Sequence, residues 1–237
     1  MQATVLIPAA GMGRRMGTKV NKQYLELAGK PILAHTLALF EHSPQIEHIY
    51  PILPADEIDY CHAQIIVKFG FSKVRKLIPG GPVRQDSVRN GLRALPLDGL
   101  DQPGRIVLVH DGARPLFNPR LLPKLISLIA DKGACVVAAP TKDTIKEVDD
   151  GLISGTPERK RLWQAQTPQG ARYHLFAEAF KSADEAGFIG TDDASLLERI
   201  GKPVAVLTGD YRNIKVTTPE DLIIASALLD SMKGESA

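Results

Sequence analysis

Short, almost continuously apolar segments alternate along the chain with longer segments in which apolar residues recur at helical spacing. The continuous runs are typical of buried strands, and the longer spacing is typical of helices that bury one face. We expect strands at 4–7, 46–53, 74–78, 105–109, 134–139, 204–207 and 214–216. We expect helices at 31–42, 56–69, 85–95, 119–130, 172–186 and 192–200, and a last helix capped by Thr218.

This alternation predicts right-handed strand–helix–strand crossovers and a mainly parallel sheet. Strands of such a sheet are covered on both faces, which explains why their sequences are continuously apolar. We therefore expect an α/β fold that is Rossmann-like, with a mostly parallel twisted sheet flanked by helices. No internal repeat or linker divides the chain, so residues 1–237 are expected to form a single domain.

The stretch 141–169 interrupts the alternation. It is polar, holds glycines and prolines, and shows no helical period. Asp149, Asp150 and Gly151 form a hairpin turn signal between the segments 145–148 and 152–154. We predict a β-hairpin arm over about 141–165 that projects from the sheet. Because an isolated two-stranded hairpin is marginally stable, the arm needs a surface to rest on.

The composition is ordinary for a soluble globular protein, with 44% hydrophobic and 24% charged residues. The net charge of +2, from 29 basic and 27 acidic residues, argues against a surface that binds nucleic acid. No apolar run is long enough to cross a membrane, and the N-terminus lacks the features of a signal peptide. Cys61 and Cys135 are expected to be reduced, and the protein to be cytoplasmic.

A glycine-rich loop at 8–17 follows the first expected strand. Glycines let a backbone approach a phosphate closely, but the loop departs from G-x-G-x-x-G at Met16, and no acid ends the second strand. Dinucleotide binding is therefore disfavoured. Within residues 1–30 five bases accompany the single acid Glu26, a local excess of +4. Such an excess suits a nucleoside triphosphate, although solvated surface bases near a turn are the simpler alternative.

Two further loops carry candidate chemistry. Asp111 and Arg114 follow the strand at 105–109, where ligands bind in open α/β sheets. Asp111 could hold Mg²⁺ or a hydroxyl, and Arg114 a phosphate, or the two could form an internal ion pair. His110 is more typical of a structural residue. The segment 80–88 has two glycines suited to contact with a flat base, but Asp86 and Ser87 in it could simply cap a helix.

No motif for nucleophilic catalysis or zinc binding occurs in the sequence, so the attacking atom of any reaction is expected to come from a substrate. Eight motifs follow one another along the chain: Pro8-Ala-Ala-Gly-x-Gly-Arg-Arg-Met, Lys22-Gln-Tyr, Gly80-Gly-x-x-Arg-x-x-Ser-Val, His110-Asp-x-Ala-Arg-Pro, Asp143-Thr, Leu162-Trp-x-x-x-Thr-Pro-Gln, Thr191-Asp-Asp-Ala-Ser and Asn213-Ile-Lys-Val-Thr. In this order they resemble the 2-C-methyl-D-erythritol 4-phosphate cytidylyltransferase family of the non-mevalonate isoprenoid pathway.

The resemblance implies a nucleotidyltransferase fold and a reaction in which methylerythritol phosphate attacks the α-phosphorus of CTP and pyrophosphate leaves. It implies that Arg15 and Lys22 stabilise charge on the CTP phosphates, and that Arg159 and Lys215 position the attacking phosphate. The implied substrate-binding residues are Asp111, Arg114, Thr144, Thr167 and Thr191. The implied nucleotide contacts are Ala9, Ala10, Gly11, Gly13, Gly81, Ser87 and Gly112.

Mg²⁺ is the implied cofactor, bound mostly by the CTP phosphates and in part by Asp111. The resemblance also implies a homodimer whose arms interlock, in which Thr144 and Arg159 complete the partner's active site. Two positions depart from the family's commonest form. Asn21 stands where proline often precedes the lysine, and Pro82 stands where an acidic residue can occur.

Two alternatives to this function stay open. A cytidylyltransferase for another polyol phosphate, such as ribitol 5-phosphate, would use the same CTP machinery. A non-catalytic nucleotide-binding regulatory protein would keep the glycine loop but could lose the charges that act on the attacking phosphate. Because all four expected cations are present, catalysis is favoured.

Overall fold

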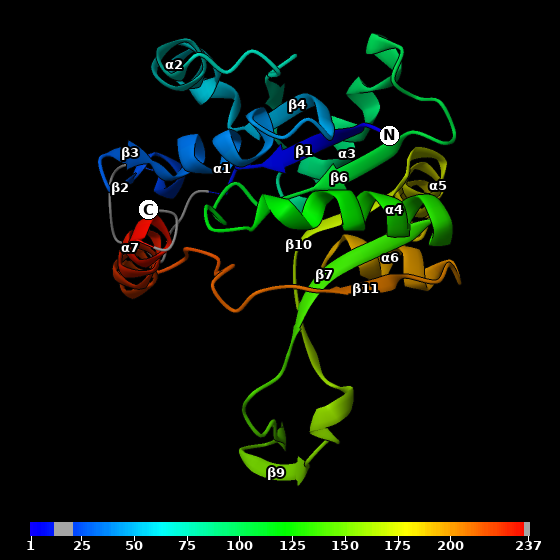
Figure 1. Cartoon of the computed structure of the whole chain (residues 1–237). Helices are drawn as coiled ribbons and strands as arrows, with labels where there is room; N and C mark the ends of the chain where they lie inside the picture. The colour runs from blue at the N-terminus through cyan, green and yellow to red at the C-terminus, as the bar shows by residue number, and fades with distance from the viewer. Residues whose placement is uncertain (12–20, 235–237) are drawn as a thin grey trace.

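The computed structural model describes residues 1–11 and 21–234, and a seven-stranded sheet forms the centre of this part of the chain (Figure 1). The strand order is β11-β7-β10-β6-β1-β4-β5. β10 runs antiparallel to β6 and β7, and every other pair is parallel. The expected mostly parallel α/β fold is thereby confirmed. The strands are β1 Ala3–Pro8, β4 Ile46–Leu53, β5 Ile78–Pro79, β6 Ile106–Val109, β7 Ala134–Pro140, β10 Trp163–Arg172 and β11 Ala205–Thr208.

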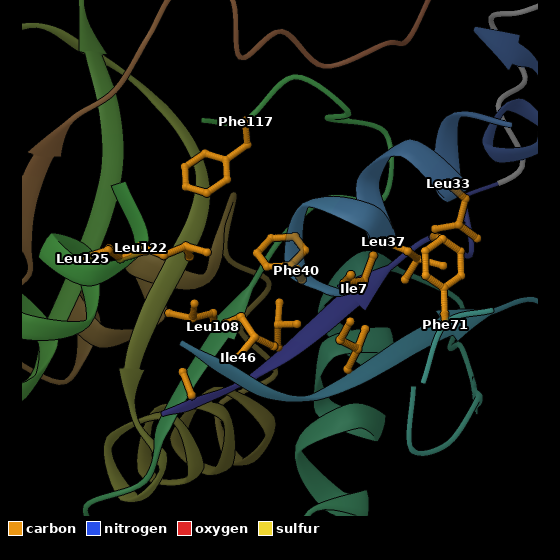
Figure 2. Close-up of a cluster of buried hydrophobic side chains, with 14 of the residues drawn as sticks. Ile7, Leu33, Leu37, Phe40, Ile46, Phe71, Leu108, Phe117, Leu122 and Leu125 are labelled. Atoms are coloured by element: carbon orange, nitrogen blue, oxygen red, sulfur yellow. The ribbon is translucent and has the colours of Figure 1, made fainter. Parts of the chain in front are cut away.

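Alternate side chains of the central strands enter two separate hydrophobic cores. In β1, Val5 and Ile7 belong to one core and Leu6 to the other, and all three are fully buried. This explains the continuous apolar run, because a strand covered on both faces has no side that can be polar. One core, with Ile7 and Phe40, is shown in Figure 2. Its face is covered by α1 Ile32–Glu41 and α4 Leu122–Lys132, and the opposite face by α3 Arg84–Ala94, α5 Tyr173–Glu185 and α6 Asp193–Arg199.

Strand β10 is a central strand that the hydrophobic pattern does not predict. It begins inside the polar stretch 141–169 and extends to Arg172, and its residues Gln166, Thr167 and Gln169 are buried and polar. Their side chains accept hydrogen bonds from Asp111, Asn213 and Ala194, the last in the first turn of α6, and these bonds compensate for burial. The part of that stretch from Trp163 onward therefore belongs to the main sheet.

Two other expectations need correction, and a third is confirmed in modified form. The strand expected at 74–78 is an isolated bridge at Val74 followed by the two-residue β5. The helix expected at 56–69 is confirmed as a continuous helical segment, but its turns vary: a 3-10 turn, Ala55–Glu57, is followed by the short α2 Ile58–Cys61, a wider π turn, His62–Val67, and a last α-helical turn at 68–69. The segment 214–216 is a loop, in which the Val216 N–H donates to the Ala113 carbonyl over 2.8 Å.

The arm leaves the sheet from β7 and returns through β10, and it projects well away from the sheet (Figure 1). Its hairpin pairs β8 Glu147–Asp149 with β9 Leu152–Gly155, as the turn signal predicts. Asp150 and Gly151 both have positive φ, 46° and 81°, which a tight hairpin turn requires. The hairpin's apolar side chains are exposed, with Leu152 75% exposed.

The remaining elements form a small layer next to α1. β2 Glu26–Leu27 pairs with β3 Lys30–Pro31, and the C-terminal helix α7 Pro219–Gly234 lies beside them. Leu27, Val216 and Ala225 share a third hydrophobic cluster there. In the described part of the chain, no helix combines the length and the apolar character that crossing a membrane would require.

Candidate active site

Loops at the carboxyl ends of β1 and β6 meet the turn between β5 and α3 and enclose a cavity of about 170 Å³, called here the first cavity. The position agrees with the expectation that ligands bind outside these strand ends. Most of the expected nucleotide-binding residues line it. The lining residues are Pro8, Ala9, Ala10, Gly11, Lys22, Gln23, Pro82, Val83, Arg84, Ser87, Asp111, Gly112, Ala113 and Lys215.

Two glycines in the loops around this cavity allow close packing. Gly112 lines the cavity, whereas Gly81, an expected nucleotide contact, immediately precedes the lining residue Pro82 and does not line it. A Cβ on Gly112 would lie 2.8 Å from the Ala9 Cβ, and one on Gly81 would lie 2.3 Å from the Asp86 Cβ. Both distances are too short for real side chains, so glycine is needed to pack the loops against each other. The backbone of the loops is thereby brought to the cavity wall.

Asp86 caps the start of α3, whereas Ser87 holds the loop that precedes it. The Ser87 hydroxyl accepts a hydrogen bond from the Gly81 N–H at 3.1 Å, and the Asp86 carboxylate accepts one from the Val83 N–H at 3.4 Å. The capping interpretation is therefore supported for Asp86, but not for Ser87, whose partner Gly81 lies outside the helix. Ser87 still lines the first cavity, so the hydroxyl fixes the loop that a ligand would touch.

A second cavity of about 260 Å³ adjoins the first. Arg84, Asp111 and Lys215 line both cavities and form a shared wall. Two ligands could therefore meet at this wall, each in its own cavity. The second cavity is lined by Arg84, Asp111, Arg114, Ala165, Gln166, Thr167, Gln169, Thr191, Asp192 and Lys215.

Asp111 is the centre of the shared wall. Its carboxylate contacts the Arg84 Nε at 3.2 Å, the Arg114 Nε at 3.3 Å and the Lys215 Nζ at 3.0 Å. Burial opposes ionisation, but the positive charges of Arg84, Lys215 and Arg114 outweigh it and hold the pKa of the Asp111 carboxyl well below its usual range. The internal Asp111–Arg114 pair considered from the sequence is present, and it is one of three.

Arg84 carries a second ion pair that the sequence analysis did not assign. Its Nη1 and Nη2 contact the Asp193 carboxylate at 3.0 and 2.7 Å. Burial alone would lower the pKa of the Arg84 guanidinium, but Asp193 and Asp111 raise it well above its usual range. Arg84 and Asp193 both occur in the motifs of the sequence, at 80–88 and 191–195. Their occurrence in two motifs was the sequence feature that could have marked them as site residues.

His110 and Thr167 fix the loop that carries Asp111. The Asp111 N–H donates to the Thr167 hydroxyl at 3.1 Å, and that hydroxyl also contacts the His110 Nδ1 at 3.1 Å. The His110 Nε2 lies 3.0 Å from the Arg114 carbonyl. His110 is fully buried, and burial lowers its pKa to about 4. The structural interpretation of His110 is supported, and Thr167 positions the backbone of Asp111.

Asn213 holds the loop that carries Lys215. Its side-chain amide donates to the Thr167 carbonyl at 2.8 Å and to the Gln166 Oε1 at 3.2 Å. The backbone carbonyl of Asn213 accepts a hydrogen bond from the Arg114 Nη1 at 2.7 Å. Asn213 is 1% exposed, so these bonds fix the polar loop over the site without help from a regular element.

Of the expected charge-stabilising residues, Lys22 faces the first cavity, and its Nζ lies 3.5 Å from the Val216 carbonyl. Arg15 and Gly13 lie outside the described residues. Thr144 and Arg159 lie on the exposed arm and line neither cavity. The Arg159 Nη1 donates instead to the Lys142 carbonyl at 3.1 Å.

The described residues build no metal cage. Within residues 1–11 and 21–234 no group of three or more histidine, cysteine or acidic side chains could hold a metal ion. Asp111, the expected ligand, has its two oxygens paired with cations. The donor set of this part of the chain therefore does not fit a divalent ion held by protein side chains.

Comparisons with known proteins agree on one family. The model of the 2-C-methyl-D-erythritol 4-phosphate cytidylyltransferase family matches residues 3–231. A relative of that name from Geotalea uraniireducens is 52% identical over 235 residues, which covers 99% of this chain and 100% of the relative. Another, from Syntrophotalea carbinolica, is 53% identical over 231 residues, which covers 98% of this chain and 97% of the relative.

Solved structures are similar to this chain over nearly its whole length. The 4-diphosphocytidyl-2C-methyl-D-erythritol synthase of Anaerococcus prevotii is 31% identical, with a TM-score of 0.83, 97% of this chain covered and 96% of that one. The 2-C-methyl-D-erythritol 4-phosphate cytidylyltransferase of Thermus thermophilus is 31% identical, with a TM-score of 0.74, 96% of this chain covered and 98% of that one.

Proposed function

We propose that this chain, which belongs to the 2-C-methyl-D-erythritol 4-phosphate cytidylyltransferase family, transfers CMP from CTP to 2-C-methyl-D-erythritol 4-phosphate. The products are 4-diphosphocytidyl-2-C-methyl-D-erythritol and pyrophosphate, in isoprenoid precursor biosynthesis. The observation that carries the proposal is the wall of Arg84, Asp111 and Lys215 that the two cavities share. CTP would occupy the first cavity and the polyol phosphate the second.

In this reaction a phosphate oxygen of the polyol phosphate attacks the α-phosphorus of CTP. The bond between the α-phosphorus and the oxygen that bridges to the β-phosphorus breaks, and its electron pair leaves with pyrophosphate. Such a transfer depends on positioning and charge stabilisation, so it needs no nucleophilic side chain. Lys22 would stabilise charge on the triphosphate, and Lys215 and Arg114 would hold the attacking phosphate. The family pattern assigns Arg15 to the triphosphate as well.

Asp111 keeps those cations in place before substrates arrive. Its negative charge is shared among Arg84, Arg114 and Lys215, and Asp193 pairs with Arg84 as well, so these three cations exceed the two carboxylates by one positive charge. A phosphate that enters the second cavity could take over part of the Lys215 and Arg114 hydrogen bonding. For the cofactor we propose that Mg²⁺ enters with the CTP phosphates, since direct binding to Asp111 would compete with three cations.

The arm supports a homodimer with interlocked arms. Val148, Leu152 and Ile153 are between 61% and 75% exposed, although burying such side chains against a partner would be favourable. Thr144 and Arg159 lie on the same arm, away from both cavities. In the proposed dimer they would reach the partner's second cavity, where Arg159 would add a charge on the attacking phosphate.

The proposed compartment is the cytoplasm. Cys61 and Cys135 are free, buried thiols, a state that suits a reducing compartment. Burial raises the pKa of the Cys61 thiol to about 12 and of the Cys135 thiol to about 11, so neither is a reactive thiolate at neutral pH.

The test is a substrate panel with a pyrophosphate readout. Purified protein with CTP and Mg²⁺ should release pyrophosphate when methylerythritol phosphate is added, and release should be slower with ribitol 5-phosphate. UTP in place of CTP serves as the nucleotide control. Equal or faster release with ribitol 5-phosphate would favour the polyol-phosphate alternative, and binding of CTP without release would favour a regulatory protein.

A further inference from the structure

Lys22 lies in a very short structural element. It opens the 3-10 turn Lys22–Tyr24, which two backbone hydrogen bonds close: the Tyr24 N–H to the Asn21 carbonyl at 2.9 Å and the Leu25 N–H to the Lys22 carbonyl at 3.2 Å. A turn of this length has few bonds of its own, so its position depends on the residues around it. The placement of the Lys22 ammonium at the first cavity thus depends on the residues that hold the turn, in addition to its own 3.5 Å contact with the Val216 carbonyl.

Glu57 holds this turn on both sides of the lysine. One carboxylate oxygen, Oε1, accepts a hydrogen bond from the Asn21 side-chain amide, and the other, Oε2, accepts one from the Gln23 side-chain amide at 3.1 Å. Asn21 and Gln23 are the residues immediately before and after Lys22. A single carboxylate therefore ties both neighbours of the lysine to the segment that follows β4.

A packed aromatic contact reinforces the same junction. The ring of Tyr24 lies edge-on to the ring of Tyr60, with 5.0 Å between the ring centroids and 75° between the planes. Gln23 and Tyr24 are buried, at 2% and 8% exposed, whereas Glu57 is partly buried. The turn is thus anchored by Gln23 and Tyr24 and by the preceding Asn21, and Lys22 lines the cavity.

We propose that Glu57 is a positioning residue for Lys22: by fixing Asn21 and Gln23, it sets where the lysine ammonium stands against the triphosphate. The inference rests on the proposed function, because it takes from it the role of Lys22. The proposal also explains how Asn21 can stand where the family often has proline. The backbone of Asn21, at φ −61° and ψ 138°, has the φ that a proline ring would impose. In this chain the hydrogen bond to Glu57 supplies the restraint that a ring would supply covalently.

The first test compares Glu57→Ala with Asp56→Ala. Asp56 is an exposed acid in the same turn, so its removal changes the charge equally without touching Asn21 or Gln23. Glu57→Ala should lower kcat/KM for CTP by about 10- to 100-fold, since a displacement of about 1 Å can cost that much. The KM for the polyol phosphate should stay within about twofold, and Asp56→Ala should match the wild type. Thermal unfolding of each variant separates this effect from a loss of folded protein.

The second test asks whether Glu57 acts through Lys22. In a Lys22→Ala background, Glu57→Ala should cause little further loss of activity, because the group that Glu57 positions is gone.

The third test restores the restraint on residue 21 by a proline ring in place of the hydrogen bond to Glu57. Asn21→Pro should have little effect alone but should recover several-fold of the activity lost in Glu57→Ala, since proline fixes φ near the observed value.

Each result has a defined consequence. Full activity of well-folded Glu57→Ala, or an equal loss in the wild-type and Lys22→Ala backgrounds, would overturn the positioning role. If Glu57→Ala does not fold, the isosteric Glu57→Gln, which keeps one acceptor oxygen, replaces it. The same kinetic effects are then expected, with a smaller fall in kcat/KM for CTP. Absence of pyrophosphate release by the wild type would overturn the proposed function itself. Normal release by both the wild type and Glu57→Ala would overturn only the positioning role of Glu57.

Discussion

Arg84 and Asp193 form a bidentate ion pair, with Nη1–Oδ1 and Nη2–Oδ2 distances of 3.0 and 2.7 Å. Asp193 is 1% exposed, so Arg84 is what compensates its charge in the protein interior. The same guanidinium contacts Asp111 with its Nε at 3.2 Å. The start of α6 is thereby joined to the wall between the two cavities.

Removal of Arg84 should be costly because it leaves Asp193 buried without its partner. We expect Arg84→Met to lower the free energy of unfolding by about 3–5 kcal/mol, measured by urea denaturation. The double variant Arg84→Met with Asp193→Leu should be more stable than the single variant, since no unpaired charge remains. If the two changes were additive, the ion pair would not be what connects these residues.

Lys215→Ala should mainly impair use of the polyol phosphate. We expect kcat/KM for that substrate to fall by about 10- to 100-fold, since a hydrogen bond to a charged group is worth about 1.5–3 kcal/mol. CTP affinity, measured by calorimetry without the second substrate, should change much less. The control is Lys181→Ala, which removes an exposed lysine of α5 outside both cavities. A loss of CTP affinity with normal turnover at saturating CTP would contradict the assigned role.

Stability should depend on pH through His110. Its folded pKa of about 4 lies below its ordinary value of 6.5, so the unfolded chain binds the proton first as pH falls. The folded state therefore loses up to about 3 kcal/mol between pH 6.5 and about 4, and none of this loss occurs above pH 6.5.

The check on that expectation is the variant His110→Asn, which cannot take up the proton. Its stability difference from the wild type, measured by urea denaturation, should narrow as pH falls from 6.5 to about 4. A difference that stays constant over this interval would mean that His110 is not protonated on unfolding.

Mixed dimers test whether the arm acts on the partner. Arg159→Ala and Lys215→Ala should each be weakly active alone. When the two are co-expressed, half of the dimers pair one of each, and in these one site has both Lys215 and the partner's Arg159. About one quarter of all sites should then be intact, giving about a quarter of wild-type activity. No gain on mixing would show that Arg159 acts within its own chain or not at all.

Much of the sheet was predictable because strands covered on both faces must be apolar along their whole length. β1 and β6 follow this rule. The hairpin turn at Asp150 and Gly151 was predictable for a different reason, because its positive φ angles favour particular residues. β10 does not follow it, since its buried Gln166 and Thr167 are satisfied by partners distant in sequence. The pattern of hydrophobic residues along the sequence does not predict such hydrogen bonds.

The sequence by itself determined the fold class, the family and most residues that line the cavities, because loops at strand ends carry recognisable motifs. Only the tertiary structure decided how those residues act together. Arg84 meets Asp193 across 109 positions, and Gln23 meets Glu57 across 34. Each motif states which charges are present, but the pairing of those charges depends on how the chain folds, since an ion pair exists only where the fold brings two side chains within reach.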